Sequence, residues 1–330
     1  MKKLIIILIL LSCIKGFSQW TQISMPTNET LIDISFKNES SGFCIAENGL
    51  ILRTQDGGNI WDIIQNNPSI TYTNIIYYDD KLVAFGTENG NYYYYYSLDQ
   101  GITWNSQISS AVPNVLGLLN NELYYQNFLS SSTLYRFNNN QPEIVATDVG
   151  IFGVNDVTNE MVYINNDFNT IYKSDDFGAN WEELNNYPSG FGQNQSTNSS
   201  IKTINSTVVA RYTYPDFLTY SIDDGNNWTE IEDNVTIGIY YFTNNGKAYG
   251  TNPSTKSIYV NTELTIWTEQ SSLSETAEDI YFYNENLGFV IGMNGMLYRT
   301  ENGGGLGMQE NDTLKKKLKS IPYQPKTNYK

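Results

Sequence analysis

The stretch Thr54-Gln-Asp-Gly-Gly-Asn-Ile-Trp61 decides the fold, because three later stretches of the chain repeat its pattern. The shared pattern is Ser/Thr-x-Asp-x-Gly-x-x-Trp, and each copy follows a strand-like run such as Ile51-Leu-Arg53. Ser/Thr and Asp side chains bond nearby backbone groups in tight turns, Gly permits unusual backbone angles, and Trp buries a large ring. The pattern therefore predicts a strand–turn–strand joint. The positions expected to have this structural role are Thr54, Asp56, Gly58, Trp61, Ser97, Asp99, Gly101, Trp104, Ser174, Asp176, Gly178, Trp181, Ser221, Asp223, Gly225 and Trp228.

This motif resembles the Asp-box, or bacterial neuraminidase repeat, of sialidases, sortilin-like propellers and photosystem II assembly-factor-like propellers. The resemblance covers about residues 20–307, and the repeat unit is most similar to the photosystem-assembly-factor type. It implies an all-β propeller in which the boxes lie on the rim, away from the functional site. Fold alone does not identify a function, so the box carboxylates are expected to be structural rather than catalytic or metal-binding.

The spacing of the box tryptophans predicts the number and closure of the blades. Trp residues or their counterparts recur at positions 20, 61, 104, 144, 181, 228, 267 and 307, at intervals close to one four-stranded blade. The last box, Thr300–Gly307, has Gly where Trp belongs, whereas Trp20 has no box before it. We therefore expect a seven-bladed propeller of four-stranded antiparallel blades, closed by the N-terminal strand pairing in the last blade, which leaves no free sheet edge at the junction.

The two ends of the chain differ in composition from the body. Lys2-Lys3 and an apolar run from Leu4 to Ile14 predict a signal peptide over residues 1–18, with the propeller over 19–308. The alternative is lipidation at Cys13, which would anchor the chain to the outer membrane. The predicted tail over 309–330 is basic and disordered, and it resembles a truncated type IX sorting segment. The signal and composition resemble those of Bacteroidetes, so we expect a secreted, extracellular or periplasmic protein.

Charge and cysteine content narrow the function classes. Of the 19 basic and 35 acidic residues, the leader holds three lysines and the tail six lysines and two acids, which leaves the body with 10 and 33, or −23. A body this acidic repels nucleic acid and anionic lipid. The chain has no His, which removes the commonest general base and metal ligand. Cys44 lies in an apolar run and is predicted to be a buried small hydrophobe. We expect no cofactor and no metal.

Sialidase activity is disfavoured by the arginine content. The resemblance implies that such chemistry needs three arginines on the substrate carboxylate, and this chain has four in all. Arg53, Arg136 and Arg299 stand just before box positions on third strands near the rim, so only Arg211 is elsewhere. A hydrolase that uses paired carboxylates is the alternative function, because Asp and Glu are plentiful.

A non-catalytic binding module is the preferred interpretation, with a protein or a glycan at the cell surface as partner, no membrane span, and a monomeric state. In a propeller the box turns share one face with the loops between first and second strands. Function is expected on the opposite face, where the longest loop runs from Asn185 to Ser200. Exposed aromatic, Asp and Arg side chains suit sugar stacking or a protein hot spot. The binding residues predicted there are Tyr187, Phe191, Arg211, Tyr214, Asp216 and Phe217.

Overall fold

The computed structural model describes residues 20–109, 113–127, 133–138, 141–155, 158–165, 170–184, 201–204, 207–212, 217–223, 225–232, 235–243, 246–261 and 267–305. These residues form 28 strands and one short 3-10 helix, η1 (Met293–Gly295). The predicted leader, the tail and the long loop from Asn185 to Ser200 lie outside the described residues. None of the described helices is long and apolar enough to cross a bilayer.

Over the described ranges the strands make seven four-stranded antiparallel sheets, numbered here in chain order. Sheets 1 to 3 contain β2 (Leu31–Phe36), β3 (Gly42–Ala46), β4 (Leu50–Thr54), β5 (Asp62–Asn66); β6 (Ile70–Tyr78), β7 (Lys81–Glu88), β8 (Asn91–Ser97), β9 (Asn105–Ile108); and β10 (Pro113–Leu119), β11 (Glu122–Asn127), β12 (Thr133–Asn138), β13 (Gln141–Thr147). Sheets 4 and 5 contain β14 (Val149–Asn155), β15 (Glu160–Asn165), β16 (Ile171–Ser174), β17 (Glu182–Leu184); and β18 (Ile201–Ile204), β19 (Thr207–Tyr212), β20 (Phe217–Ser221), β21 (Thr229–Glu232). Sheets 6 and 7 contain β22 (Ile239–Phe242), β23 (Ala248–Asn252), β24 (Ser257–Asn261), β25 (Thr268–Ser272); and β26 (Ala277–Phe282), β27 (Gly288–Gly292), β28 (Met296–Thr300), β1 (Thr21–Ile23).

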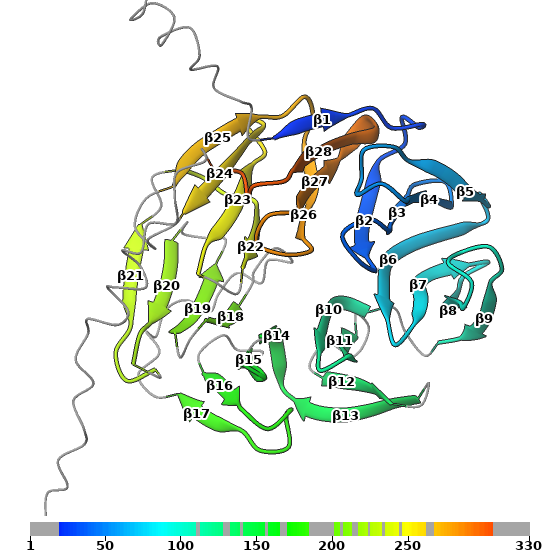
Figure 1. The fold of residues 1–330 in the computed structure, drawn as a ribbon. Coiled ribbons are helices and arrows are strands. Elements are labelled where there is room, and N and C mark those ends of the chain that lie inside the picture. The colour runs from blue at the N-terminus through cyan, green and yellow to red at the C-terminus, as the bar shows by residue number, and fades with distance from the viewer. Residues whose placement is uncertain are drawn as a thin grey trace, which may run out of the picture.

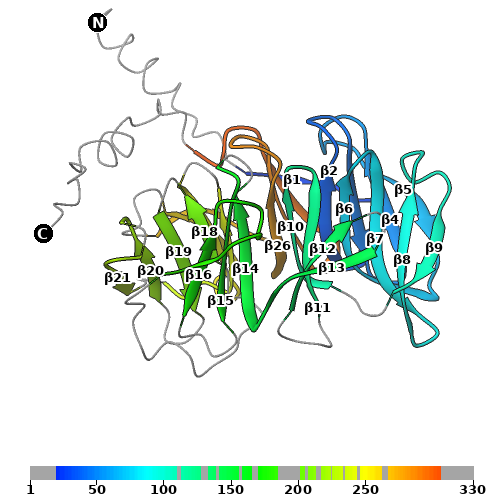
Figure 2. The same ribbon diagram turned by 90° about the horizontal axis from the view of Figure 1, so that it is seen from below.

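The sheets are arranged as the blades of a ring, with the first strand of each blade nearest the centre (Figure 1). Seen edge-on, the ring is a disc whose strands cross its thickness (Figure 2). The prediction of an all-β propeller with four-stranded antiparallel blades is therefore confirmed. The blades are joined internally by tight turns, of which Asn89-Gly90 is typical: both residues have positive φ, as a two-residue hairpin of matching twist requires.

The hydrophobic core is divided among the junctions between neighbouring blades. Each of seven buried clusters among the described residues draws its side chains from two adjacent sheets, and together they follow the ring once round. The tyrosine run in β8 shows how: Tyr93 and Tyr95 pack toward sheet 1, whereas Tyr92, Tyr94 and Tyr96 pack toward sheet 3. Side chains alternate along a strand, so the predicted use of this run for packing between blades is confirmed. Cys44 is buried in β3, also as predicted.

The ring closes through its N-terminal strand, as predicted. In β1 and β28, Thr21 pairs with Arg299 and Ile23 with Leu297, so the first described strand is the outer strand of sheet 7 (Figure 1). Trp20 is 1% exposed and packs edge-on against Tyr249 and Phe282. A Cβ on Gly304 would lie 2.7 Å from Trp20 Nε1. Trp20 therefore lies against the glycine of the seventh box, as Trp104 lies against Gly101, although it comes from the other end of the chain.

We expect Trp20→Ala to destabilise the protein strongly, because it empties a buried ring site and loosens the closing strand. Large-to-small changes of buried Trp cost about 3–5 kcal/mol. The measurement is chemical denaturation followed by circular dichroism. Ile108→Ala is the matched control, because Ile108 is 77% exposed on the outer strand of sheet 2 and should change stability little. Equal midpoints for the two variants would contradict closure through β1.

Candidate functional site

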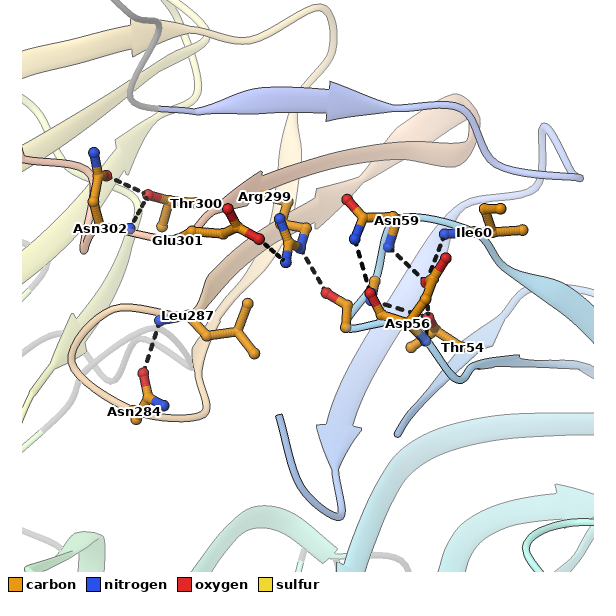
Figure 3. A network of polar contacts seen from close by, with 12 residues as sticks. Thr54, Asp56, Asn59, Ile60, Asn284, Leu287, Arg299, Thr300, Glu301 and Asn302 are labelled. Atoms are coloured by element: carbon orange, nitrogen blue, oxygen red, sulfur yellow. Dashed lines mark hydrogen bonds and ion pairs between the residues drawn. The ribbon is translucent and has the colours of Figure 1, made fainter. Parts of the chain in front are cut away.

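The first Asp-box builds its turn from its own side chains (Figure 3). The Thr54 hydroxyl donates to Asp56 Oδ1 at 2.9 Å and accepts from the backbone N–H of Gly58 at 2.9 Å. Asp56 Oδ1 also accepts from the N–H groups of Asn59 and Ile60, at 3.0 and 2.9 Å. Trp61 Nε1 donates to the carbonyl of Gly58 at 3.1 Å. Hydroxyl, carboxylate and indole are thus all engaged within the eight residues.

The bond from the hydroxyl to the carboxylate recurs in the other boxes, and the indole bond recurs at Trp104 and Trp228 but not at Trp181. The hydroxyls of Ser97, Ser174 and Ser221 donate to Asp99, Asp176 and Asp223 at 2.8, 2.9 and 3.0 Å. The divergent box of sheet 7 keeps this geometry with an amide, since the Thr300 hydroxyl donates to Asn302 Oδ1 at 2.9 Å. An uncharged residue at the third position still forms the turn. The boxes are therefore hydrogen-bonded joints whose polar atoms are directed at their own backbone.

The box hydrogen bonds change the pKa of the carboxyl groups. In Asp99, bonds from the side chain and backbone of Thr103 and from Ser97 lower the pKa to about 2. The pKa of Asp176 is lowered by the equivalent bonds from Asn180 and Ser174. For Asp56, burial raises the pKa but the bonds from Ile60, Thr54 and Asn59 outweigh it and lower the pKa overall. Charged acceptors of several N–H and O–H donors are stabilised in their ionised form.

On the box face, sheets 7 and 1 are joined by a polar network (Figure 3). Arg299 on β28 donates from Nε to the carbonyl of Gly57 in the first box at 2.6 Å, and its Nη2 lies 2.6 Å from Glu301. Nearby, Asn284 donates to Glu39 at 2.9 Å across the same junction. The box turns and the loops between first and second strands thus share one face, because the N–H of Gly57 also donates to the carbonyl of Ser40.

Two neighbouring inner strands carry a pair of carboxyl groups that sequence reasoning missed. Asp33 on β2 and Asp279 on β26 each follow a bulge at the start of their strand. Asp33 accepts from the N–H of Ile34 at 2.7 Å and from the N–H of Ile75 on β6 at 2.8 Å, which ties sheet 1 to sheet 2. Asp279 accepts from the N–H of Ile280 at 2.8 Å. Alignment of β2 with β26 would have found the pair, because Asp occupies the third position of both.

The environment of this pair favours the protonated carboxyl. Burial raises the pKa of Asp33 to about 7, although the N–H groups of Ile75 and Ile34 lower it. Burial also raises the pKa of Asp279 well above its usual range, and the neighbouring Asp33 raises it further. Burial is the main cause of the raised pKa of the Cys44 thiol, and the charges of Asp33 and Asp279 raise this pKa further. Two enclosed carboxyls that share a junction without a cation resist double ionisation.

The binding residues predicted on the opposite face fall largely outside the described residues. Tyr187, Phe191, Tyr214 and Asp216 are not among them. Arg211 lies on β19 and Phe217 on β20, neighbouring strands of sheet 5, and only their backbones are described. The structure therefore places two of the six positions in one blade. No group of three or more His, Cys, Asp or Glu suited to a metal is present in the described part of the chain.

Comparison with known sequences links the first quarter of the chain to one family. Residues 14–90 match the model described as "Photosynthesis system II assembly factor YCF48". Photosystem II assembly lipoprotein Ycf48 of Trichormus variabilis is 36% identical over 63 residues, 18% of this chain and 19% of that protein. The photosystem II stability/assembly factor HCF136 of Cyanidioschyzon merolae is 40% identical over 45 residues, 13% of this chain and 10% of that protein. The matched segments thus span at most a fifth of these relatives.

Solved structures extend the likeness to the whole ring. "YCF48 from Cyanidioschyzon merolae" superposes with a TM-score of 0.64 at 17% identity, over 86% of this chain and 98% of that chain. "YCF48 bound to D1 peptide" superposes with a TM-score of 0.62 at 14% identity, over 86% of this chain and 97% of that chain. Virginiamycin B lyase from Staphylococcus aureus, an enzyme, gives 0.63 at 11% identity, over 85% and 98%. At these identities the likeness shows the propeller fold alone, and the fold serves both binding and catalysis.

We expect Asp99→Asn to reduce the loss of stability in acid. The folded-state pKa is lowered below the unfolded value, so the contribution of Asp99 is present above pH 4 and is lost as the pH falls toward 2. Unfolding free energy is to be measured by denaturant titration at several pH values. Asp80→Asn, which removes an exposed carboxylate on a hairpin turn, is the control. If the unfolding free energy of Asp99→Asn fell as steeply as that of the wild type when the pH is lowered, the box hydrogen bonds would not be the cause of the acid sensitivity.

We expect Asp279→Asn to act in the opposite pH range. The folded-state pKa values of Asp33 and Asp279 are raised, in Asp33 to about 7, so the stability that they contribute is fully present below pH 4 and is lost as the pH rises through these values. The variant should lose less stability than the wild type between pH 5 and pH 8, in the same denaturant titrations. Asp99→Asn serves as the control in this range. If the wild type gained stability over this range, the pair would not be held protonated.

Proposed function

We propose that this chain is a secreted, non-catalytic propeller that binds a protein through the face opposite the Asp-boxes. The observation that carries the proposal is the match of residues 14–90 to the Ycf48 assembly-factor model, together with a likeness in fold to the structure of YCF48 bound to D1 peptide. The matched segment contains the first box, all of sheet 1 and the first two strands of sheet 2. Binding of a polypeptide by this chain is the function we infer from that likeness.

The internal geometry supports a surface away from the boxes. On the box face, the polar side chains of the boxes are bonded to their own turns. The opposite face is formed by loops such as the turn after β3, where the N–H of Glu47 donates to the carbonyl of Thr30 in the loop before β2. Glu47 itself is exposed there. Loops held on a rigid scaffold are the usual carriers of binding residues.

The carboxylate pair supports binding rather than hydrolysis. Paired-carboxylate hydrolases need one ionised nucleophile or base beside a protonated acid. Both oxygens of Asp33 accept backbone N–H groups, one of them from the neighbouring blade, so this side chain acts as a tie between blades. Burial raises the pKa of both members of the pair, which disfavours the ionised partner that the reaction requires. We therefore assign the pair to the stability of the ring.

The test is capture of a partner by the tagged protein, recovered from the culture medium or the cell surface and cross-linked to the outer-membrane fraction. Glu47→Lys on the proposed face should abolish capture of a specific protein. Ile222→Lys, at a 45% exposed position in the box that begins at Ser221, is the matched control and should leave capture intact. Loss of capture in the control alone would move the surface to the box face. Binding on a glycan array without protein capture, or hydrolysis of a glycoside, would reject the proposal.

A further inference from the structure

Four blades have a basic residue directly before the first box position, on the third strand. These residues are Arg53, Arg136, Lys173 and Arg299. Alternation along the strand directs this side chain toward the next blade, as Arg299 shows by reaching Gly57. On β4, Ile51 packs in the cluster shared with sheet 2, and Arg53, two residues later, projects to the same side.

Three of the four are paired with a glutamate of the chain itself. Arg136 lies 2.7 Å from Glu143, Lys173 lies 2.8 Å from Glu160, and Arg299 lies 2.6 Å from Glu301. Arg53 differs, because it forms no ion pair with any described residue and its Nε is buried without a hydrogen-bond partner. A buried donor of a charged group that is left without an acceptor destabilises the folded protein.

Two neighbouring side chains, Gln55 and Asp62, explain why Arg53 forms no ion pair with a described residue. Gln55 stands at the box position where Glu301 pairs with Arg299, so the charge that would neutralise Arg53 is missing. Asp62 is the cross-strand neighbour of Arg53, as Glu143 is of Arg136. Asp62 is one methylene shorter than glutamate and does not close the pair. The cation that a glutamate neutralises in sheets 3, 4 and 7 therefore has no such partner among the described residues of sheet 1.

Aliphatic side chains line the junction of sheets 1 and 2, toward which Arg53 projects. Ile64, on the outer strand of sheet 1, reaches the second box so closely that a Cβ on Gly101 would lie 2.5 Å from its Cδ1. The two boxes that border this junction expose Ile60, which is 67% accessible, and Ile102, which is 73% accessible. A guanidinium beside exposed aliphatic side chains suits a carboxylate that is flanked by apolar groups.

We propose that Arg53 binds a glutamate side chain of a partner protein at the rim between sheets 1 and 2, with apolar neighbours of that glutamate resting on Ile60 and Ile102. The commitment to glutamate follows from the chain itself, in which a glutamate pairs with each of the three cations equivalent to Arg53, although the glutamates come from different positions of the blade. This surface lies on the box side of the ring and is independent of the face assigned under the proposed function.

Arginine side-chain NMR tests the site directly, because the chain has only four arginines and each gives one Nε–Hε signal. The probe is the blocked peptide acetyl-Ile-Glu-Ile-amide, with acetyl-Ile-Gln-Ile-amide as its matched control. We expect the glutamate peptide to move the Arg53 signal to lower field in a saturable manner and to leave the Arg136 and Arg299 signals in place. The glutamine peptide should bind about ten- to a hundredfold more weakly, as expected for loss of a charged hydrogen bond.

Two variants separate binding from general structural effects. Arg53→Gln should abolish saturable binding, whereas Arg136→Gln, which removes an equivalent cation that is already paired, should not. Asp62→Glu should fill the site from within the chain, as Glu143 does, and weaken the peptide about tenfold. The remaining arginine signals report whether each variant is folded.

Three results would overturn the proposal. Equal shifts with the two peptides would show that the charge is not recognised. A change of the Arg53 signal on Asp62→Asn without peptide, equal to that caused by the glutamate peptide, would show that Asp62 already occupies the site. Tighter binding of acetyl-Ile-Ile with a free C-terminus would assign the site to a terminal carboxylate instead of a glutamate side chain.

Discussion

The pairing of β1 with β28 is the constraint on which the rest of the structure depends. A sheet of this kind has two edges, and an open ring would leave the outer edge of sheet 7 and the N-terminal strand both unpaired. The pairing joins residues about 280 positions apart and places Trp20 in a buried cluster with side chains of sheets 6 and 7. Each core cluster is shared by two blades, so opening one junction exposes apolar surface from both.

The strand–turn–strand joint is built in two ways in this protein, from one continuous stretch or from both ends of the chain. In the contiguous boxes one stretch of eight residues supplies the hydroxyl, the carboxylate, the glycine and the ring. In sheet 7 the first three parts come from the C-terminal side, with Asn302 as acceptor, and the ring comes from Trp20. The charge of the box Asp is thus dispensable for the turn, since the amide oxygen of Asn302 accepts the same hydrogen bond. The hydroxyls and carboxylates of the four boxes are bonded within their own turns, so these groups are not available for chemistry or recognition.

Electrostatics in this acidic protein act mainly through pairs within the chain. The box carboxylates are stabilised as anions by their own turns, whereas Asp33 and Asp279 are enclosed without a cation and favour the protonated form. At the rim, glutamates neutralise three of the four basic residues that precede the boxes. Arg53 is the exception at that position, and its unpaired Nε marks the junction of sheets 1 and 2 as chemically different from the others.

The sequence by itself determined the propeller, the four-stranded blades, the hydrogen-bonded boxes and the closure by Trp20–Ile23, because each rests on a local pattern that is repeated along the chain. It also determined the packing of the tyrosine run, since alternation in a strand follows from backbone geometry alone. The predicted binding residues from Tyr187 to Phe217 stay a prediction, because four of the six lie outside the described residues and only the backbones of Arg211 and Phe217 are described. Only the tertiary structure decided that Asp33 and Asp279 share a junction and that Arg53 has no partner. Both depend on which blades are neighbours and on how far one side chain reaches across a strand pair, a difference as small as the methylene that separates Asp62 from a glutamate.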